Sequence, residues 1–411
     1  MIQFIHTADI HFGMENYGKI DPKTGIHTRL LDFEKALNFC IDYAIEKKVD
    51  FFLFAGDAYK TAHPTPTQQK LLLQCLLRLY KANIPVVIVV GNHDNPLSFG
   101  KANSLEIFGD MPLEGFHVFT KPGILKLETK NGPVQIVGIP WPTRNTLSLN
   151  ASYEEHSEAI TSIISKAVAT LIKQFASELD SAIPSVLTSH LTVNSGIFSG
   201  SEKRAIYGND PVLMPSELAI EPFDYVGLGH LHRYQNLNPK GYPAIVYSGS
   251  IERIDFGERK EPKGFCHVKL AREKTTHEFI EGPMRPFYQV DVTLSAHKDQ
   301  TETILEALEK IELNQAVIKI VYRLPAEVKD TVDIRTIEKA CNSAHYLVNI
   351  VPVHEVVARS KRMASGTQTM NLETLLETYF IQKNESAPMR AFLIKKGIEL
   401  HNRAQDTTNE E

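Results

Sequence analysis

Five short apolar segments of the chain share one ending, in which polar side chains follow directly after the apolar residues. The segments read "IQFIHTADIH", "DFFLFAGD", "VVIVVGNHD", "PSVLTSH" and "FDYVGLGHLH". Their lengths and their branched and aromatic residues are typical of buried strands. The pattern therefore predicts a sheet whose strands carry functional groups at their carboxyl ends.

Helical patterns separate the first three of these segments. Apolar residues recur every three or four positions across Arg29–Lys48 and Thr65–Asn83, and Tyr153–Leu179 supplies a further long helix before the fourth segment. Alternating strands and helices imply right-handed crossovers and a largely parallel strand order. Residues up to about Pro283 are thus predicted to form a layered α/β domain, with the polar strand ends gathered at one edge.

The pattern changes after "GPMRP" at residues 282–286. Strands alternate with short helices up to residue 355, which predicts a small α+β cap domain without polar strand ends. Two amphipathic helical stretches follow, and an amphipathic pair of this kind docks on a partner or packs on its own chain. We therefore predict a first domain over residues 1–283, a cap over 284–355 and a C-terminal helical segment over 356–411.

Composition excludes several classes of protein. Hydrophobic residues make up 43% and charged residues 23% of the 411 positions, and no signal peptide or bilayer-spanning stretch is visible, so a soluble cytoplasmic protein is expected. The net charge of -5 argues against coating nucleic acid through bulk positive charge, but leaves room for a local phosphate-binding cleft. The four cysteines are scattered, which favours buried reduced thiols over disulfides or a zinc site.

Seven polar side chains at the strand ends form a candidate metal site. Asp9 and His11 lie two positions apart on a segment predicted to be extended, so both side chains point the same way, and His230 and His232 repeat this spacing. Oxygen and imidazole ligands suit manganese or iron better than thiophilic ions. The predicted ligands are Asp9, His11, Asp57, Asn92, His190, His230 and His232.

The number of carboxylates in this set bears on the substrate. Two ions about 4 Å apart need a bridging group, and a carboxylate such as Asp57, which follows a glycine, is the natural bridge. Only Asp9 and Asp57 are acidic, so two divalent ions would keep excess positive charge that attracts a phosphodiester and a hydroxide. Each motif alone is common in turns, but all five in this order make coincidence improbable.

These motifs carry a family resemblance. "DIH" at Asp9–His11, "GD" at Gly56–Asp57, "GNHD" at Gly91–Asp94, "SH" at Ser189–His190 and "GHLH" at Gly229–His232 resemble the five motifs of the calcineurin-like metallophosphoesterase superfamily. The resemblance covers roughly residues 1–285. It implies a four-layer β-sandwich flanked by helices rather than a single open sheet.

Within that superfamily the chain resembles the SbcD-type nucleases of double-strand-break repair. The stretch "FIHTADIHFG", the run Tyr247–Phe265, and the cap followed by a helical segment are similar to that family. The resemblance implies that Asp9, His11, Asp57 and His232 hold one ion and that Asp57, Asn92, His190 and His230 hold the other. It makes His93 the general acid or transition-state stabiliser.

The resemblance also implies an activity and partners. It implies two divalent ions, manganese first and magnesium or iron as alternatives, and hydrolysis of DNA by water that the ions activate. Exonuclease action on double-stranded ends and endonuclease action on single strands and hairpins would serve repair and recombination. An SbcC-type ATPase would receive the helices at Asn371–Phe380 and Met389–Arg403, and helices near Thr65–Tyr80 and Ser98–Phe108 would form a homodimer.

Some alternatives stay open on the sequence. A phosphatase acting on a small molecule or phosphoprotein would use the same ions, although protein phosphatases of the superfamily follow the bridging aspartate with aspartate, arginine and glycine, which "GDAYKTA" lacks. A scaffold without activity would lose ligands, and none is missing. The cap either selects DNA ends or only protects the sheet.

Two residues near the motifs have open roles. Relatives often carry a histidine or an acid where this chain has Lys60, and a lysine binds phosphate as a point charge but accepts no hydrogen bond. A solvated loop lysine is an equal alternative. Asp94 either orients His93 or caps a turn, and the turn is favoured.

Overall fold

The computed structural model describes residues 1–96, 101–147, 157–200, 210–326, 328–355, 372–383 and 386–408. The chain divides into two compact units. The first comprises Met1–Val292, Asp299–Tyr322 and Thr331–Val351, and the second comprises Thr293–Lys298, Arg323–Asp330 and Pro352–Glu411.

Two six-stranded sheets form the body of the first unit. The first sheet has the order β14-β13-β1-β2-β3-β4, in which β1 to β4 run parallel and β13 and β14 are antiparallel additions. Its strands are β1 (Ile2–Thr7), β2 (Phe51–Phe54), β3 (Val86–Val89), β4 (Phe116–Phe119), β13 (Gly264–Leu270) and β14 (Thr276–Glu281).

The second sheet has the order β11-β12-β10-β7-β6-β5, with parallel strands in its centre and an antiparallel strand at each edge. Its strands are β5 (Gly123–Thr129), β6 (Gly132–Ile139), β7 (Ser185–His190), β10 (Tyr225–Gly229), β11 (Gln235–Asn236) and β12 (Ala244–Tyr247). A short pair, β8 (Thr192–Val193) with β9 (Val212–Leu213), follows β7.

The two sheets pack face to face around an apolar core. Phe4 and Phe51 of the first sheet stack with their ring centroids 4.4 Å apart, and Tyr225 of the second sheet meets Phe4 edge-on at 5.6 Å. Val134, Val186 and their neighbours complete this fully buried layer. Aromatic and branched residues on alternate positions therefore join the sheets by burial of apolar surface.

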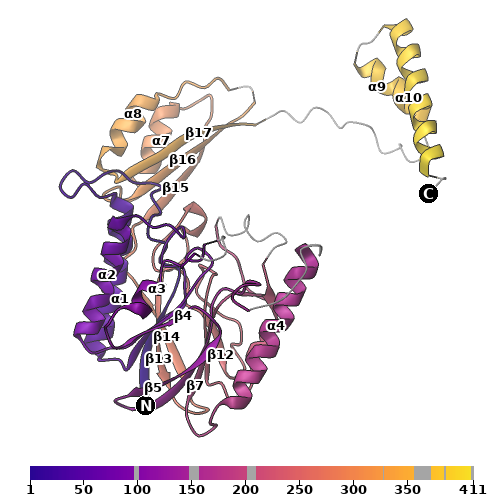
Figure 1. Cartoon of the computed structure of the whole chain (residues 1–411). Coiled ribbons are helices and arrows are strands. Elements are labelled where there is room, and N and C mark those ends of the chain that lie inside the picture. Colours follow the sequence, from indigo (N-terminus) through magenta and orange to yellow (C-terminus); the bar gives the residue numbers. More distant parts are fainter. Residues whose placement is uncertain are drawn as a thin grey trace. The chain divides into compact units, whose positions relative to one another are not determined.

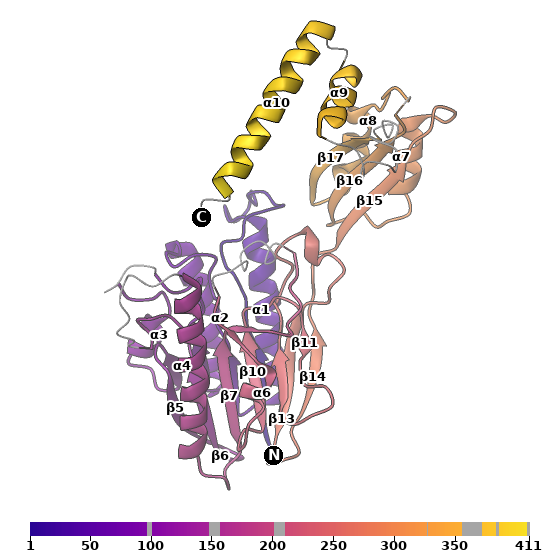
Figure 2. The same ribbon diagram turned by 90° about the vertical axis from the view of Figure 1, so that its right-hand side faces the viewer.

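Helices cover the outer faces of both sheets, as Figures 1 and 2 show. α1 (Thr28–Lys47), α2 (Pro66–Lys81) and α3 (Glu106–Asp110) pack on the first sheet, and α4 (Ser157–Glu178) and α6 (Pro215–Leu218) pack on the second. α2 begins where the sequence predicts, because Thr65 and Gln68 form a capping box. This order of layers confirms the predicted four-layer sandwich.

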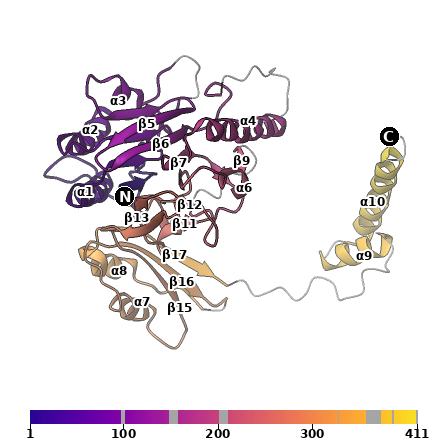
Figure 3. The ribbon, with the colours of Figure 1, turned by 90° about the horizontal axis from the view of Figure 1, so that it is seen from below.

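A three-stranded sheet in the order β15-β16-β17 follows the sandwich in sequence. Figure 3 shows α7 and α8 on the same face of this sheet. The predicted alternation of strands and short helices is confirmed. The domain boundaries themselves stay a prediction. The elements are β15 (Phe287–Thr293), α7 (Gln300–Leu308), β16 (Val317–Leu324), α8 (Ile334–Ala340), η2 (Cys341–Ser343) and β17 (Tyr346–His354).

Two further helices belong to the second unit. α9 (Leu372–Gln382) and α10 (Ala387–Thr408) pack on each other, and the backbone of Gly397 lies against the side chain of Leu376. Among the described helices, none is long and apolar enough to cross a membrane. The four cysteines are buried free thiols, as predicted.

Candidate metal centre

All seven predicted ligands gather at the carboxyl ends of the central strands. The sequence pattern predicts one edge of a single sheet, and this is wrong in one respect, because the strand ends come from both sheets. The loops after β1, β2 and β3 belong to the first sheet, whereas β7 and the loop after β10 belong to the second. The loop after β1 carries Asp9 and His11, the loop after β2 carries Asp57, and the loop after β3 carries Asn92. In the second sheet, His190 ends β7, and the loop after β10 carries His230 and His232.

The backbone at these positions is strained. Asp9, His11 and Asp57 have φ values of 54°, 52° and 59°, and His230 has 102°. Left-handed conformations are costly for residues other than glycine and persist where the surroundings hold them. β1 ends at Thr7, so Asp9 and His11 do not lie on the extended segment that the sequence predicts.

Two glycines let these loops approach one another. Gly56 has a φ of 98°, and a Cβ there would lie 2.4 Å from Nδ1 of His190. A Cβ at Gly91 would lie 2.1 Å from Oδ1 of Asp57. Any side chain at either position would displace a predicted ligand.

The side chains of Asp9, His11 and His232, which we call the braced half, meet at one side of the site. Their ligand atoms all lie within 4.8 Å of one another, and Nε2 of His11 is 3.1 Å from Nε2 of His232. Nδ1 of His232 donates to Oε1 of Glu258 at 2.9 Å. Since that nitrogen carries the proton, Nε2 of His232 presents its lone pair to the site.

A buried ion pair supports the braced half from behind. Nζ of Lys263 lies 3.0 Å from Oε2 of Glu258 and donates to the carbonyl oxygen of His232 at 2.7 Å. Both charged side chains are fully buried. Burial would raise the pKa of Glu258, but Lys263 and His232 outweigh it and lower the pKa to about 2. Glu258 therefore remains a carboxylate that holds the His232 ring in one tautomer.

The side chains of Asn92, His190 and His230, which we call the open half, lie on the other side of Asp57. Nδ1 of His190 donates to the carbonyl oxygen of Ala55 at 2.7 Å. Oδ1 of Asn92 lies 3.0 Å from Nε2 of His190 and 3.2 Å from Nδ1 of His230. Both imidazoles thus turn a ring nitrogen toward the same amide oxygen.

This donor set fits a divalent cation. With its Nδ1 proton directed at Ala55, neutral His190 turns a lone pair toward Oδ1 of Asn92 and toward Oδ2 of Asp57, 3.3 Å away. Burial lowers the pKa of His190, but the charge of Asp57 outweighs this and raises it to about 9. A positive charge is needed between these three groups, two of which are buried, and a metal ion supplies it as a proton does.

Asp57 lies between the two halves. Its Oδ2 is 3.6 Å from Nε2 of His11 and 3.3 Å from Nε2 of His190. Burial would raise the pKa of Asp57, but the surrounding imidazoles, His190 first, lower it below its ordinary value. An ionised carboxylate in this place is positioned to serve both halves.

His93 lies beside the ligands without filling a place in either half. Its backbone N–H donates to Oδ1 of Asp57 at 2.9 Å, and Nδ1 of its exposed ring donates to the carbonyl oxygen of Lys60 at 2.8 Å. A ring nitrogen of His93 also lies within 4.8 Å of a ring nitrogen of His11 and of a carboxylate oxygen of Asp57. The contact at position 60 uses the backbone, whereas the Lys60 side chain is exposed.

Asp94 holds the loops together. Its carboxylate accepts hydrogen bonds from the backbone N–H groups of Asp57, Ala58, Tyr59 and Gly91, at 2.8 to 3.2 Å. All four donors belong to the turns that carry Asp57 and Asn92. This geometry matches the turn-capping interpretation of Asp94.

Sequence reasoning missed four residues that contact the predicted ligands. Glu258 and Lys263 support His232, and Asp210 lies 3.2 Å from Nε2 of His230 through Oδ2. Trp141, two residues after the end of β6, places its ring centroid 5.0 Å from that of His230. Glu258 and Lys263 lie in the run 247–265 that carries the family resemblance, but no spacing rule connects them to His232.

Comparison with known proteins assigns the chain to a family whose chemistry agrees with this centre. The family model described as calcineurin-like phosphoesterase matches residues 2–234. The chain belongs to the calcineurin-like phosphoesterase family. Members of this family use divalent metal ions to hydrolyse phosphoesters, in agreement with the donor set described above.

The phosphoesterase also has a curated relative. It is 28% identical over 310 residues to the D subunit of the nuclease SbcCD from Staphylococcus saprophyticus, which covers 75% of this chain and 76% of the relative. This confirms the predicted resemblance to SbcD-type nucleases.

Two solved structures match 68% of the phosphoesterase chain. One is from Thermus thermophilus, with 13% identity, a TM-score of 0.37 and 98% of that chain covered. The other is a dimetal phosphatase from Danio rerio, with 9% identity, a TM-score of 0.39 and 96% covered. Neither likeness is close enough to bear on function.

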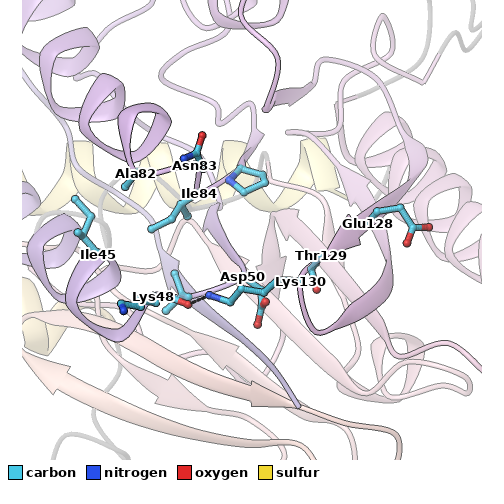
Figure 4. A pocket seen from close by; sticks show the side chains of 11 residues that line it. Ile45, Lys48, Asp50, Ala82, Asn83, Ile84, Glu128, Thr129 and Lys130 are labelled. Atoms are coloured by element: carbon cyan, nitrogen blue, oxygen red, sulfur yellow. Dashed lines mark hydrogen bonds between the residues drawn. The ribbon is translucent and has the colours of Figure 1, made fainter.

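A pocket of about 550 Å³ lies at the opposite end of the phosphoesterase strands (Figure 4). Val49 and Asp50 precede β2, and Ile84 and Pro85 precede β3, so the pocket adjoins their amino ends. Asp50 accepts a hydrogen bond from the N–H of Gln3 at 2.7 Å. None of the predicted metal ligands lines this pocket.

Proposed function

We propose that this chain is a metal-dependent DNA nuclease subunit of the SbcD type, which hydrolyses phosphodiester bonds in repair and recombination. One observation carries the proposal: three quarters of the chain is similar to a protein named as a nuclease subunit. The gathering of every predicted ligand at one site agrees with it. The alternative to DNA as the substrate is a smaller phosphoester.

The two halves of the centre would hold two divalent ions. Asp9, His11 and His232 would hold one, and Asn92, His190 and His230 the other, with Asp57 shared. Manganese suits these nitrogen and oxygen donors best, and magnesium or iron are the alternatives. When bound, such ions lower the pKa of water and neutralise the charge of a phosphodiester.

His93 would supply the proton for the leaving group. Its Nδ1 donates to the carbonyl oxygen of Lys60, which fixes the plane of the ring. In the protonated ring Nε2 then carries the remaining proton. Donation from Nε2 to the leaving 3′ oxygen is general acid catalysis.

Exposed apolar side chains on the two C-terminal helices support the proposal of a protein partner. Tyr379 and Ile381 of α9 are 52% and 50% exposed, and Phe392 and Leu400 of α10 are 58% and 64% exposed. Apolar helix faces of this kind are docking surfaces. We propose that these faces bind an SbcC-type coiled-coil ATPase. Residue 371 of the predicted segment 371–380 lies outside the described residues.

A homodimer is proposed through α2 and α3. Ile107 is 64% exposed and Tyr80 39% exposed, which supports contact along this face; residues 98–100 of the predicted segment lie outside the described part. Two subunits with two ATPase chains would act in the cytoplasm on double-stranded ends as an exonuclease, and on hairpins and single strands as an endonuclease. The cap would select among these ends.

A labelled hairpin duplex tests the proposal. The purified protein is incubated with the hairpin, with and without manganese, ATP and the ATPase partner. We expect cleavage that needs manganese and is lost in Asp57→Asn, whereas Asp42→Asn on the surface of α1 keeps it. Cleavage that survives removal of all metal would contradict the two-ion site.

Model phosphoesters distinguish the runner-up. Release of phosphate from p-nitrophenyl phosphate together with no cutting of DNA would replace the nuclease proposal by a phosphatase. Hydrolysis of both DNA and a model diester, lost together in Asp57→Asn, supports the nuclease.

A further inference from the structure

Trp141 is the single tryptophan of the chain, and it stands at the edge of the open half. It follows β6 in the sequence "IPWPT", where Pro140 and Pro142 are both buried. A residue between two prolines has little conformational freedom. The N–H of Trp141 donates to the carbonyl oxygen of Val90 at 2.8 Å, which ties this segment to the loop that carries Asn92. The indole is therefore presented on a rigid support.

The ring lies over the imidazoles of the open half. Its centroid is 5.0 Å from that of His230 with the planes tilted by 38°, and 6.2 Å from that of His190 with the planes at 70°. The side chain is only half-buried, so part of the ring meets solvent beside the candidate ligands. Among the described residues its indole N–H has no acceptor.

The imidazoles do not need the indole for their orientation. Nδ1 of His190 donates to the carbonyl oxygen of Ala55, and Nε2 of His230 lies 3.2 Å from Oδ2 of Asp210. Each ring therefore has a partner that sets its orientation without the indole. The orientation of the two rings therefore does not explain why a large, partly exposed aromatic side chain lies beside the proposed phosphodiester site.

We propose that Trp141 is the stacking platform for an unpaired nucleobase next to the scissile phosphate. This inference rests on the proposed nuclease function. Every nucleobase has a π-face, so an aromatic platform binds single strands with little sequence preference. In a duplex both faces of each base are covered by neighbouring bases, so the platform favours a base that has left the helix at an end or in a hairpin loop. Trp141 is a specificity-determining residue under this proposal.

Two single-stranded oligomers test it. One carries thymine at every position, and the other has the same length with abasic residues throughout. With manganese, we expect the kcat/KM of the wild-type protein for the thymine oligomer to exceed that for the abasic oligomer by about tenfold or more. Trp141→Leu removes the π-face but keeps an apolar side chain, and should lower that ratio to near one, whereas Trp141→Phe keeps most of it. Bound manganese and cleavage of the abasic oligomer should be unchanged in Trp141→Leu.

Fluorescence provides a readout without turnover, because all indole emission comes from Trp141. In the metal-free protein with chelator, the thymine oligomer should quench this emission and the abasic oligomer should not, at concentrations where labelled oligomers show both to be bound.

Three results would overturn the inference. The wild-type protein could cleave both oligomers equally, or Trp141→Leu could keep the preference for thymine. Equal loss on both oligomers together with loss of manganese would show that Trp141 only packs against His230. If the wild-type protein cleaves neither oligomer nor the hairpin, the nuclease proposal itself fails, which is a separate result.

Discussion

The two halves of the metal centre differ in what stands behind them. In the braced half, His232 is supported by Glu258 and Lys263, a charged pair with no exposed side-chain surface. In the open half, His230 is supported by Asp210, whose side chain is 15% exposed. The support behind His232 is therefore fully buried, whereas the support behind His230 is partly exposed.

We propose that this difference separates the side that holds a metal from the side that meets the substrate. Buried charge pairs are costly to break, so they fix the position of a ligand at all times. The half-exposed Trp141 lies on the opposite side, against His230 and His190. We infer that substrate enters over the open half.

The largest loss of activity is expected for His93→Gln. Because His93 belongs to neither half, this variant should lose catalysis and keep its metal. Loss of a general acid lowers kcat by about 10²- to 10⁴-fold. Manganese binding, measured by calorimetry, should stay within about threefold of the wild-type value. His63→Gln, at an exposed position on the neighbouring loop, is the matched control. Full cleavage by His93→Gln would remove the assigned role.

The next largest effects are expected for Glu258→Gln and Asp210→Asn, which compare the two halves directly through metal affinity and stability. Loss of a carboxylate that orients a ligating imidazole lowers metal affinity about 10- to 100-fold. Glu258→Gln also removes the carboxylate 3.0 Å from the buried Nζ of Lys263 and leaves it Glu261, at 3.3 Å, and the carbonyl oxygen of His232, so the free energy of unfolding should fall by about 3 kcal/mol.

Asp210→Asn should change the free energy of unfolding by less than about 1 kcal/mol, because its site is partly solvated. Urea unfolding of the metal-free proteins measures both values. Equal losses of stability in the two variants would show that the halves do not differ in support.

A smaller effect is expected from pH. The pKa of Glu258 falls from 4.5 to about 2 in the folded protein, so its ionised form stabilises the fold above pH 4.5. That contribution, about 3 kcal/mol, is lost as the pH falls from about 4.5 to about 2. The stability difference between wild type and Glu258→Gln, followed in metal-free protein from pH 7 to pH 3, should be constant at first and then shrink. A constant difference at every pH would contradict this assignment.

The smallest effect is expected for Lys60→Ala. Only the carbonyl oxygen at this position contacts His93, and any residue supplies it. Activity on the hairpin should change by less than about threefold. A loss of tenfold or more would show that the exposed ammonium group binds the phosphate.

Local signals in the sequence predict much of this fold. α2 begins at its capping box, and the polar endings of five strands give all seven gathered residues. Strand length and alternation do not tell which sheet a strand joins, so the pattern alone could not place β7 and β10 opposite β1 to β3.

The remaining features depend on long-range contacts. Asp9 and His11 adopt left-handed conformations because their N–H groups bond to the carbonyl oxygens of Gly56 and Asp57, which lie far along the chain. Glu258 is 26 residues from the His232 that it contacts. Neither feature leaves a periodic signal in the sequence.

The origin of the ligands in two different sheets has a consequence for thermal stability. An ion held by Asp57 from one sheet and His190 from the other binds only the closed sandwich and not the unfolded chain. By mass action, a free ion at 100 times its dissociation constant stabilises the folded state by about 2.7 kcal/mol. An ion bound in this way would thus raise the melting temperature of the whole domain as the free metal concentration rises.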